Sequence, residues 1–456
     1  MPDTHLQSDT TALPVQVPLV TRKLGILQSL RASRDNVLSI IPEIALHEPI
    51  VSGRTGKPWH MVTEPGAIRR ILLENIDNYP KSEVTKNLLK PAVGDSLFIA
   101  EGAHWRWQRR TAAPAFSHRN VMNLAPVISA AAERSVARIE DAGPRAVDMM
   151  QEMVTTTFDV ISDVTFSGGE GFDRDVVHQA IDAYISEAGK ISLFDVLGLP
   201  SWVPRPGRAL SVAGVTDMRE VADTAIEARA ERGASGIPDL LDLLMAGEDP
   251  DSGRRMTVTE LRDNLLTFIV AGHETTALAL SWSLYLLAFD QDAQDRVRDE
   301  TRSLLSDGVA RGEDVARLTG VRQVVDEALR LYPPGGMVSR TAQASDRLCG
   351  RRIGAGDTVI VPIYALHRHH ALWEAPHAFR PQRWAGDKPE RYAYLPFGDG
   401  PRICIGASFA LQEAVIILAT LLANFRFTPV KGRDPKPVMI LTLRPEGGVW
   451  LEAERL

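Results

Sequence analysis

The amino-acid sequence predicts a mostly α-helical single domain with a small β-sheet segregated from the helices. The main observation is a long apolar pattern with helical periodicity from about 257 to 290, with further helical patterns on both sides of it. Strand-like runs are short and fall mainly around 49–62 and 340–362. No Gly/Ser-rich or Pro-rich linker divides residues 1–456, so residues 1–48 are expected to pack on the same domain.

The elements are expected in a definite order along the chain. Short strands at 49–52 and 60–62 flank a Gly-Arg-Thr-Gly-Lys-Pro turn, because glycine and proline favour tight turns. An apolar connector broken by prolines at 198–207 separates two helices. A helix follows Cys404 and ends near Asn424, and strand-like pieces close the chain. The other helices are expected at 65–75, 103–113, 121–142, 149–165, 176–188, 257–290, 292–305 and 322–331.

Composition excludes several functional classes. The net charge of −7 argues against nucleic acid as the main partner. Two cysteines give no disulfide framework, which favours a reducing compartment and a cytoplasmic location. The first 21 residues lack the pattern of a signal peptide. The longest uncharged apolar stretch, 275–289, is shorter than the roughly 18–20 residues that a transmembrane helix needs.

Cys404 lies in the run Phe397-Gly-Asp-Gly-Pro-Arg-Ile-Cys-Ile-Gly406, a glycine-rich apolar loop before a helical pattern. A single thiolate in such a loop suits one soft metal ligand, whereas a zinc site needs about three or four ligands close together. The glycines would let the backbone pass close to a flat group and present N–H groups to the sulfur. Arg402 would pair with a carboxylate, and Phe397 would shield the ligand from water. The alternative is a buried structural cysteine in a turn.

This run, read as FxxGxRxCxG, resembles the haem-binding loop of the cytochrome P450 family. The resemblance extends from about Pro49 to the C-terminus and implies the fold of that family, in its soluble bacterial form. It places haem b between the 257–290 helix and the loop, with Cys404 as the axial ligand of the iron. Phe397, Gly398, Arg402 and Gly406 would then surround the haem.

The run Ala271-Gly-His-Glu-Thr-Thr276 interrupts the apolar helix with a charge and three polar side chains. Burying the Glu274 carboxylate is costly unless it is paired or functional, and no basic residue lies three or four positions away. Gly272 would let the helix open locally, so that a hydroxyl such as Thr275 could hold water. The alternative is a polar notch that kinks a core helix. The resemblance assigns Glu274 and Thr275 to the acid–alcohol pair that delivers protons, places Ala271 and Gly272 at the haem, and leaves His273 outside the iron site.

Glu327 and Arg330 lie one helical turn apart and can pair, although such pairs usually occupy a solvated face. Their position before Pro333-Pro334 resembles the family's ExxR helix. Arg383 in Phe379-Arg-Pro-Gln-Arg-Trp384 resembles the third member of that ion-pair triad. The resemblance makes this triad a structural brace for the Cys404 loop.

Trp105 and Arg109 lie four positions apart in a basic run and resemble the family's haem-propionate pair. Arg340 and Arg402 match two further propionate arginines. The alternative for the basic run is a solvated helix face, and Arg106 and Arg110 could face an acidic redox partner.

Two further features carry no site. The run His367-Arg-His-His370 resembles an ordinary family strand leading to Trp373, and adjacent residues on a strand point to opposite sides, so no metal is assigned to it. Cys349 precedes Gly350 in an expected hairpin and is interpreted as a passive small residue.

The resemblance implies a monooxygenase that uses dioxygen to hydroxylate or epoxidise an apolar small molecule. Because no flavin or iron–sulfur motif is recognisable, electrons are expected from a ferredoxin and a ferredoxin reductase, with NAD(P)H used only through them. Three alternatives remain: a peroxygenase driven by hydrogen peroxide, an enzyme that isomerises or dehydrates oxygenated substrates, and a non-enzymatic haem sensor. Peroxygenase-like relatives replace the acid–alcohol pair, which is present here, and no signalling module is visible.

The substrate pocket implied by the family is almost entirely apolar, so the ligand is expected to be mostly hydrocarbon. The motif sequences resemble those of family branches whose substrates are fatty acids, terpenoids or other lipids. The expected lining consists of Leu88, Leu89, Val93, Leu97, Phe98, Leu266, Ile269, Val270, Met337, Val338, Ile440 and Leu441.

Overall fold

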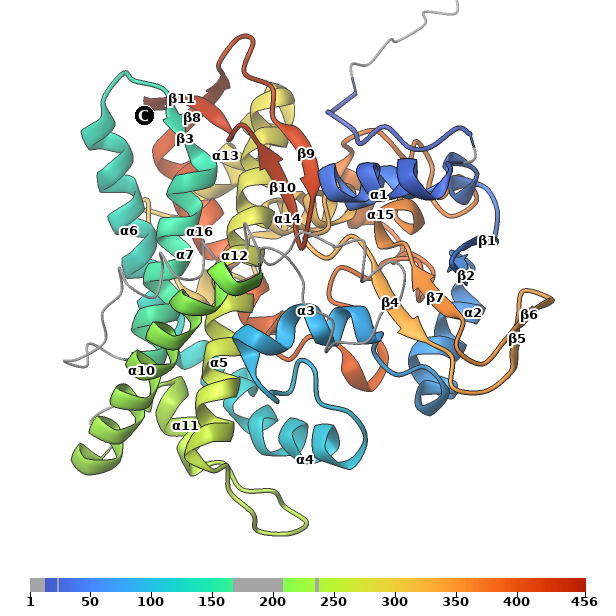
Figure 1. Cartoon of the computed structure of the whole chain (residues 1–456). Helices are drawn as coiled ribbons and strands as arrows, with labels where there is room; N and C mark the ends of the chain where they lie inside the picture. The colour runs from blue at the N-terminus through green and yellow to red at the C-terminus, as the bar shows by residue number, and fades with distance from the viewer. Residues whose placement is uncertain (1–12, 23, 167–207, 234–237) are drawn as a thin grey trace, which may run out of the picture.

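A computed structural model describes residues 13–22, 24–166, 208–233 and 238–456. Helices make up most of it, and the largest sheet lies to one side of them, at the right of Figure 1. The fold class predicted from the sequence is therefore confirmed. The predicted helix at 176–188 and the connector at 198–207 lie outside the described residues.

The long helix α12 (Val258–Phe289) runs through the centre of the molecule (Figure 1). Thr257 caps its start, because the Thr257 side chain accepts from the Glu260 N–H while the Glu260 carboxylate accepts from the Thr257 N–H at 2.9 Å. Most of its side chains from Leu261 to Ala288 are buried. Its bounds differ by only one residue from the sequence prediction.

Four long helices pack on α12 and fix its position. They are α7 (Met149–Phe166), α10 (Arg208–Arg232), α14 (Thr319–Leu331) and α16 (Ala407–Asn424). The remaining helices complete the helical part, namely α1 (Ile26–Asp35), α2 (Pro65–Arg69), α3 (Glu83–Val93), α4 (Gly102–Ala112), α5 (His118–Asn123), α6 (Ala125–Ala142), α11 (Leu240–Ala246), α13 (Gln291–Leu304) and α15 (Ile363–Leu366).

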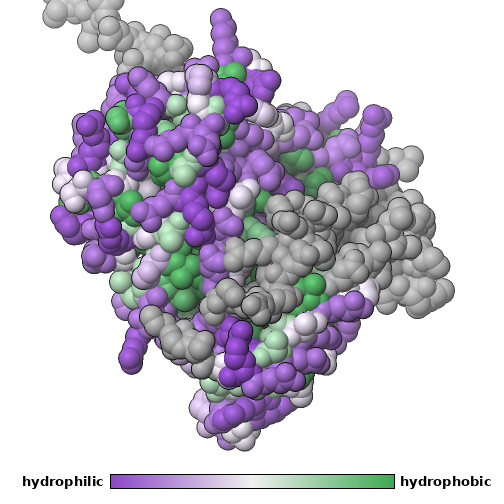
Figure 2. All heavy atoms as spheres, turned by 90° about the vertical axis from the view of Figure 1, so that its left-hand side faces the viewer, coloured by the Kyte–Doolittle hydropathy of each residue, from purple (hydrophilic) through white to green (hydrophobic). Residues whose placement is uncertain are grey.

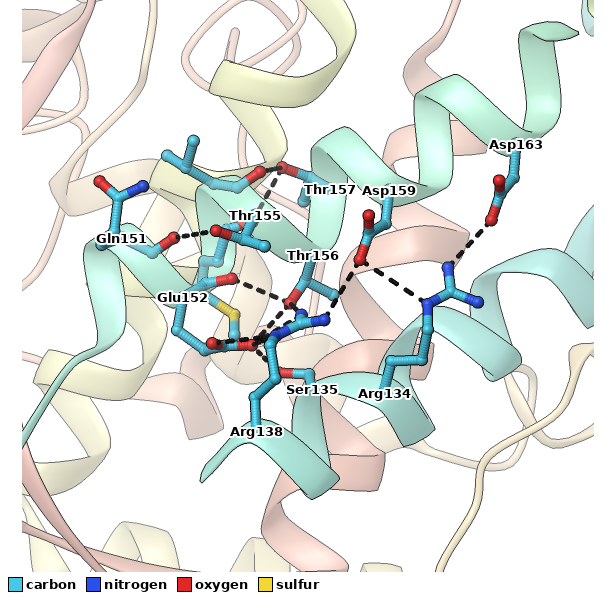
Figure 3. A network of polar contacts seen from close by, with 12 residues as sticks. Arg134, Ser135, Arg138, Gln151, Glu152, Thr155, Thr156, Thr157, Asp159 and Asp163 are labelled. Carbon is cyan, nitrogen blue, oxygen red and sulfur yellow. Dashed lines mark hydrogen bonds and ion pairs between the residues drawn. The ribbon is translucent and has the colours of Figure 1, made fainter. Parts of the chain in front are cut away.

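A polar network joins α6 to α7, as Figure 3 shows. Arg138 on α6 donates to the Glu152 carboxylate at 2.8 Å and to the Thr156 hydroxyl at 2.9 Å, both on α7. One position further along α7, the Thr157 hydroxyl donates to the main-chain oxygen of His273 on α12 at 2.8 Å. The network therefore holds α7 in the position from which it supports the polar segment of α12.

The largest sheet has four strands in the order β1 (Ile50–Thr55), β2 (Lys57–Val62), β7 (Thr358–Val361) and β4 (Val338–Thr341). Only the β2–β7 pair is parallel. Three smaller sheets contain β3 (Val147–Asp148) with β11 (Trp450–Arg455) and β8 (Phe425–Pro429), β9 (Lys436–Met439) with β10 (Leu443–Glu446), and β5 (Asp346–Leu348) with β6 (Arg351–Ile353). Cys349 and Gly350 form the predicted hairpin turn between β5 and β6, both with positive φ.

Three local predictions are wrong. The helix expected at 121–142 is divided at Leu124 into α5 and α6, because Pro126 starts a new helix in its first turn. The predicted helices leave 76–102 without a helix, but the structure has α3 there, which starts at the Ser82 cap and ends at Gly94 with φ of +56°. The run from His367 follows the short helix α15 and not a strand.

Among the described residues, α16 is the one helix that is long and apolar enough to cross a membrane by length and composition. It is mostly buried against other helices, as expected for a core helix. The face in Figure 2 is mainly hydrophilic, with small scattered apolar areas.

Candidate active site

The loop before α16 is held in a fixed shape by its glycines. Gly398 and Gly400 have φ of +71° and +72°, a conformation that favours glycine. A Cβ atom on Gly400 would lie 2.3 Å from the main-chain oxygen of Leu72, so no larger residue fits. The Cys404 N–H donates to the Phe397 carbonyl at 2.9 Å, which closes the loop just before Gly406 caps α16.

The Cys404 thiol is the reactive group of this loop. Its side chain has accessible surface although protein atoms surround it closely. Burial raises the pKa of the thiol, while the Gly406 N–H and the charge of Arg109 act in the opposite direction. Among the described residues no three His, Cys, Asp or Glu side chains form a metal cluster, so this site offers one sulfur and not a zinc cage.

The polar segment of α12 leaves accessible surface in the middle of a buried helix. Ala271 is exposed, and Gly272 and Thr275 are half-buried. The Thr275 hydroxyl donates to the Ala271 carbonyl at 2.8 Å. The helix stays continuous here, so the predicted local opening at Gly272 is wrong. The glycine instead gives close packing, because a Cβ atom at this position would lie 3.3 Å from the Ile161 side chain on α7, which would have to shift slightly.

Glu274 is buried and has partners outside its own helix. Its Oε1 atom accepts from the Thr442 hydroxyl at 2.6 Å and from Arg444 Nε at 2.5 Å. The sequence correctly excluded a partner three or four positions away, but could not show one about 170 residues later. His273 is also buried, and its Nδ1 lies 2.8 Å from the Ile269 carbonyl, so one ring nitrogen is already used within α12.

Three cations gather beside the Cys404 loop around a single acid, Glu101. Arg402 pairs with the Glu101 carboxylate, which also accepts from the main-chain N–H of Lys81 at 2.6 Å, while the Lys81 ammonium donates to the carbonyls of Leu97 and Ala100. Arg340 faces Arg402 from β4. Burial, together with the neighbouring charge of Arg402, lowers the pKa of Lys81 to about 7 and that of Arg340 to about 10. Glu101 acts in the opposite direction on all three cations but carries only one charge.

Trp105 and Arg109 lie on α4 as predicted, but the two side chains have different surroundings. Trp105 is buried with the Arg402 guanidinium 5.5 Å from its ring centre. Arg109 Nη1 donates to the Ile403 carbonyl at 2.8 Å and lies close enough to Cys404 for their charges to interact. The structure thus brings Arg340 and Arg402 together, and places Arg109 beside the cysteine.

These residues can be tested against the cofactor that the Cys404 motif implies. The Nε atoms of Arg340 and Arg402 are buried and have no hydrogen-bond partner among the described residues. With Lys81, they form a cationic cluster that one glutamate does not neutralise. Haem carries two propionate carboxylates and an iron that accepts a thiolate ligand. The donor set therefore fits haem.

Glu327, Arg330 and Arg383 form a connected group in which Glu327 and Arg330 are fully buried and Arg383 is partly buried. Arg330 binds the Glu327 carboxylate with two hydrogen bonds of 2.8 and 2.9 Å, and Arg383 Nε donates to it at 3.1 Å. Trp384 Nε1 donates to the same carboxylate at 3.0 Å. Burial would raise the pKa of Glu327, but the charges and hydrogen bonds of Arg330 and Arg383 outweigh it and hold the pKa below its usual value. The pair is therefore buried and not the solvated surface pair considered as an alternative.

The residues expected to line a substrate pocket fall into two groups. Leu89, Val93, Leu97, Leu266 and Ile269 are buried core residues. The Leu88 side chain lies outside the described residues. The others keep accessible surface, namely Phe98, Val270, Met337, Val338, Ile440 and Leu441.

Sequence reasoning missed four residues of this region. Lys81 is the third cation of the cluster, Glu101 is its acid, and Arg444 pairs with Glu274. Glu413 on α16 is fully buried beside Thr276, and burial raises its pKa to about 8, so it is protonated at neutral pH. Of these four residues, only Glu413 could have been recognised from the sequence, because it is an acidic residue within the apolar helical pattern of 407–424.

Comparison with known proteins gives an independent result. The family model for cytochrome P450 matches residues 35–452. Cyclooctatin synthase of Streptomyces melanosporofaciens is 30% identical over 90% of each chain. Cyclooctat-9-en-7-ol 5-monooxygenase of the same organism is 31% identical over 93% of this chain and 90% of its own. Cytokinin hydroxylase of Arabidopsis thaliana is 31% identical over 91% of this chain and 84% of its own. The chain therefore belongs to the cytochrome P450 family of haem-dependent monooxygenases.

Proposed function

We propose that this protein hydroxylates or epoxidises a mostly apolar small molecule, and that a terpenoid or similar lipid-like compound is its substrate. The observation that carries the proposal is the single Cys404 thiol beside an uncompensated cationic cluster, in a fold where α16 packs on the polar segment of α12. Two relatives are named for cyclooctatin chemistry, and one name specifies an unsaturated alcohol as substrate. The apolar residues that keep accessible surface, such as Phe98 and Val270, support the same substrate class.

Each group has a role in this proposal. Cys404 would hold the iron of haem b, and the cations Lys81, Arg340 and Arg402 would bind the propionates, with Trp105 against Arg402. The haem supplies the oxygen-activating chemistry when bound. Phe397, Gly398, Gly406, Ala271 and Gly272 let the chain approach a flat group closely, while Arg109 fixes the loop through Ile403.

The remaining residues transfer protons or support the Cys404 loop. Thr275 exposes a hydroxyl on α12 that can hold and pass a proton. Glu274 is a positioning residue and a charge, fixed by Thr442 and Arg444. Glu327, Arg330 and Arg383 brace the loop from behind. In this proposal the chain is also one domain, which is supported in the described part by the hydrogen bond from the Val17 N–H to the Tyr364 hydroxyl at 3.0 Å. The cytoplasmic location stays a prediction from composition.

Thr275→Ala is expected to separate electron consumption from product formation. The variant should bind haem and substrate and consume NAD(P)H with its partners, but release hydrogen peroxide and form roughly tenfold less product or lower. Thr267→Ala is the matched control. The Thr267 hydroxyl also donates to the carbonyl four residues before it on α12, that of Asp263, at 2.7 Å. The ratio of product to NAD(P)H oxidised measures the effect. Equal ratios in both variants would remove Thr275 from the proposal.

Reconstitution tests the function as a whole. Purified protein with NAD(P)H alone should form no product, and addition of a ferredoxin and its reductase should give oxygen-dependent product. Hydrogen peroxide alone should not replace them, and efficient peroxide-driven turnover would favour a peroxygenase.

The proposed docking surface for the redox partner is smaller than the one that the sequence indicated, which included both Arg106 and Arg110. Arg110 is balanced by Asp249 at 2.7 Å and Asp251 at 3.3 Å, so its charge is not free for a partner. Arg106 pairs with the exposed Asp77 and keeps half of its own surface accessible. Electron transfer should weaken above about 0.1–0.2 M salt, and Arg106→Glu should raise the KM for ferredoxin.

A further inference from the structure

A polar pocket lies between the N-terminal segment and the chain around α15. Its volume is about 620 Å³, and it shares no residue with the cluster around Cys404 and Arg402. Residues 16–19 form one wall, and Arg368, His370 and His377 form another. The N-terminal wall is fixed, because the Tyr364 hydroxyl accepts from the Val17 N–H and Tyr332 donates to the Val15 carbonyl at 2.7 Å.

Arg368 is a buried cation without a carboxylate partner. Its side chain is 1% exposed, and its Nε and Nη2 atoms have no hydrogen-bond partner among the described residues. The remaining contact is a long one, 3.5 Å from Nη1 to the Tyr364 carbonyl. The guanidinium lies 3.8 Å from the ring centre of Tyr364, which compensates it only by about 0.5–2 kcal/mol. An unpaired buried charge costs several kcal/mol, so the position favours a counter-ion.

The chain itself supplies no such counter-ion in the described part. Glu327 is the carboxylate whose charge acts on Arg368, and Arg330 and Arg383 already share it. Glu43 lines the pocket but its side chain is exposed at the rim. Two hydrogen-bonding directions of Arg368 therefore remain for a group that enters the pocket.

Three imidazoles complete the polar lining. His47 and His370 are stacked with ring centres 4.2 Å apart, and His377 follows at 5.6 Å from His370. The Nδ1 atom of His377 is buried without a partner among the described residues. Burial, followed by the charge of Arg368, lowers the pKa of His377 to about 4, so the ring is neutral at pH 7 and can donate one N–H.

This arrangement does not suit a metal ion. No metal-binding cluster of His, Cys, Asp or Glu occurs in the described ranges, and stacked rings do not converge their nitrogens on one point. The Arg368 charge would repel a cation. The same groups suit an oxyanion, because a guanidinium offers parallel N–H donors that match a carboxylate or phosphate.

We propose that this pocket binds a small oxyanion, the carboxylate or phosphate group of a small molecule, through Arg368 Nε and Nη2 with His377 as a second donor. The anion neutralises the buried charge and joins the N-terminal wall to the segment that follows α15. Bound anion therefore stabilises the attachment of residues 13–20 to the domain. The site is separate from substrate oxidation.

The test uses purified holoprotein titrated with inorganic phosphate and, separately, with acetate and citrate, at constant ionic strength with sodium chloride as the reference. The midpoint of thermal unfolding should rise saturably with at least one oxyanion and not with chloride. A lower dissociation constant for phosphate would identify a phosphate ligand, and a lower one for acetate or citrate would identify a carboxylate ligand. Arg368→Met and His377→Phe should each weaken binding, Arg368→Met by about 10- to 100-fold, as expected for loss of charge-assisted hydrogen bonds.

Arg322→Ala is the control, since Arg322 is a half-exposed arginine on α14 with its own partner, Asp326. Its titration should match that of the unsubstituted protein. If Arg368→Met does not fold, His377→Phe and the NMR titration of the His377 ring carry the test, because a bound anion raises the pKa of that imidazole. Equal anion responses in all variants, no saturation below about tens of millimolar, or stabilisation by zinc in place of oxyanions would each overturn the proposal.

Discussion

Replacing Cys404 with serine is expected to remove the thiolate signature from the protein. A serine hydroxyl has almost the same size as the thiol but does not supply a soft, charged ligand to iron. The reduced protein with carbon monoxide should lose the absorption band characteristic of thiolate ligation, and monooxygenase activity should be abolished. The loop itself should survive, because its shape depends on Gly398, Gly400 and the Cys404 N–H rather than on the sulfur.

Cys349→Ser is the matched control within the same chain. Cys349 lies in the β5–β6 turn, and burial raises the pKa of its thiol to about 11, so it is a poor thiolate donor at neutral pH. The control should keep the band and the activity. Loss of the band in Cys349→Ser with retention in Cys404→Ser would contradict the assignment of the whole loop. Far-ultraviolet circular dichroism of both variants separates a ligand effect from unfolding.

The sequence was most informative where local chemistry alone determines structure. The long apolar pattern with helical periodicity at 257–290 predicted α12 almost to the residue, and the structure adds the capping box of Thr257 and Glu260 at its start. The glycines around Cys404 predicted a tight loop, and two of them have the positive φ that only glycine adopts easily. Both features depend on neighbours in sequence, which a single chain displays directly.

Predictions were wrong where the local signal was weak or mixed. No helix was predicted at 83–93, yet α3 forms there although it contains Pro91, because Ser82 caps it and it packs on α12. Gly272 was interpreted as a site where the helix opens, but its lack of a side chain serves the contact with Ile161. In both cases tertiary packing outweighed local propensity.

Partners distant in sequence could not be predicted at all. Glu274 meets Arg444, and Lys81 meets Glu101 and Arg402, only because the fold brings their elements together. The buried charge of Arg368 is of the same kind, because it lies just after α15, in the run from His367 that the sequence indicated as a strand. Charge compensation in the interior is a property of the whole fold, so one sequence shows the charges and not their balance.

Arg330→Met is expected to destabilise the folded protein by about 3–5 kcal/mol, a large share of the roughly 5–15 kcal/mol that holds a protein folded. The guanidinium donates to both oxygens of Glu327 and to the carbonyls of His367, Pro376 and Ala378. Methionine fills much of the space but satisfies none of these acceptors, so the buried carboxylate keeps only the side chains of Arg383 and Trp384 and the main-chain N–H of Arg380 as donors. Because the cofactor complicates equilibrium unfolding, the urea midpoint and the rate of haem loss are both measured.

The neighbouring pair on α14 provides the comparison that decides between a brace and an ordinary ion pair. Arg322 and Asp326 are also one turn apart, at 2.8 Å, but Arg322 is half-exposed, so Arg322→Ala should cost only about 0.3–0.5 kcal/mol. The double variant Glu327→Leu/Arg330→Met should recover part of the loss, because removing both partners of a buried pair leaves no unpaired charge from that pair. Recovery stays incomplete, since the three carbonyls still lack their donor. If Arg330→Met instead cost no more than Arg322→Ala, the buried group would not hold the structure behind the Cys404 loop, and haem retention in that variant would equal that of the unsubstituted protein.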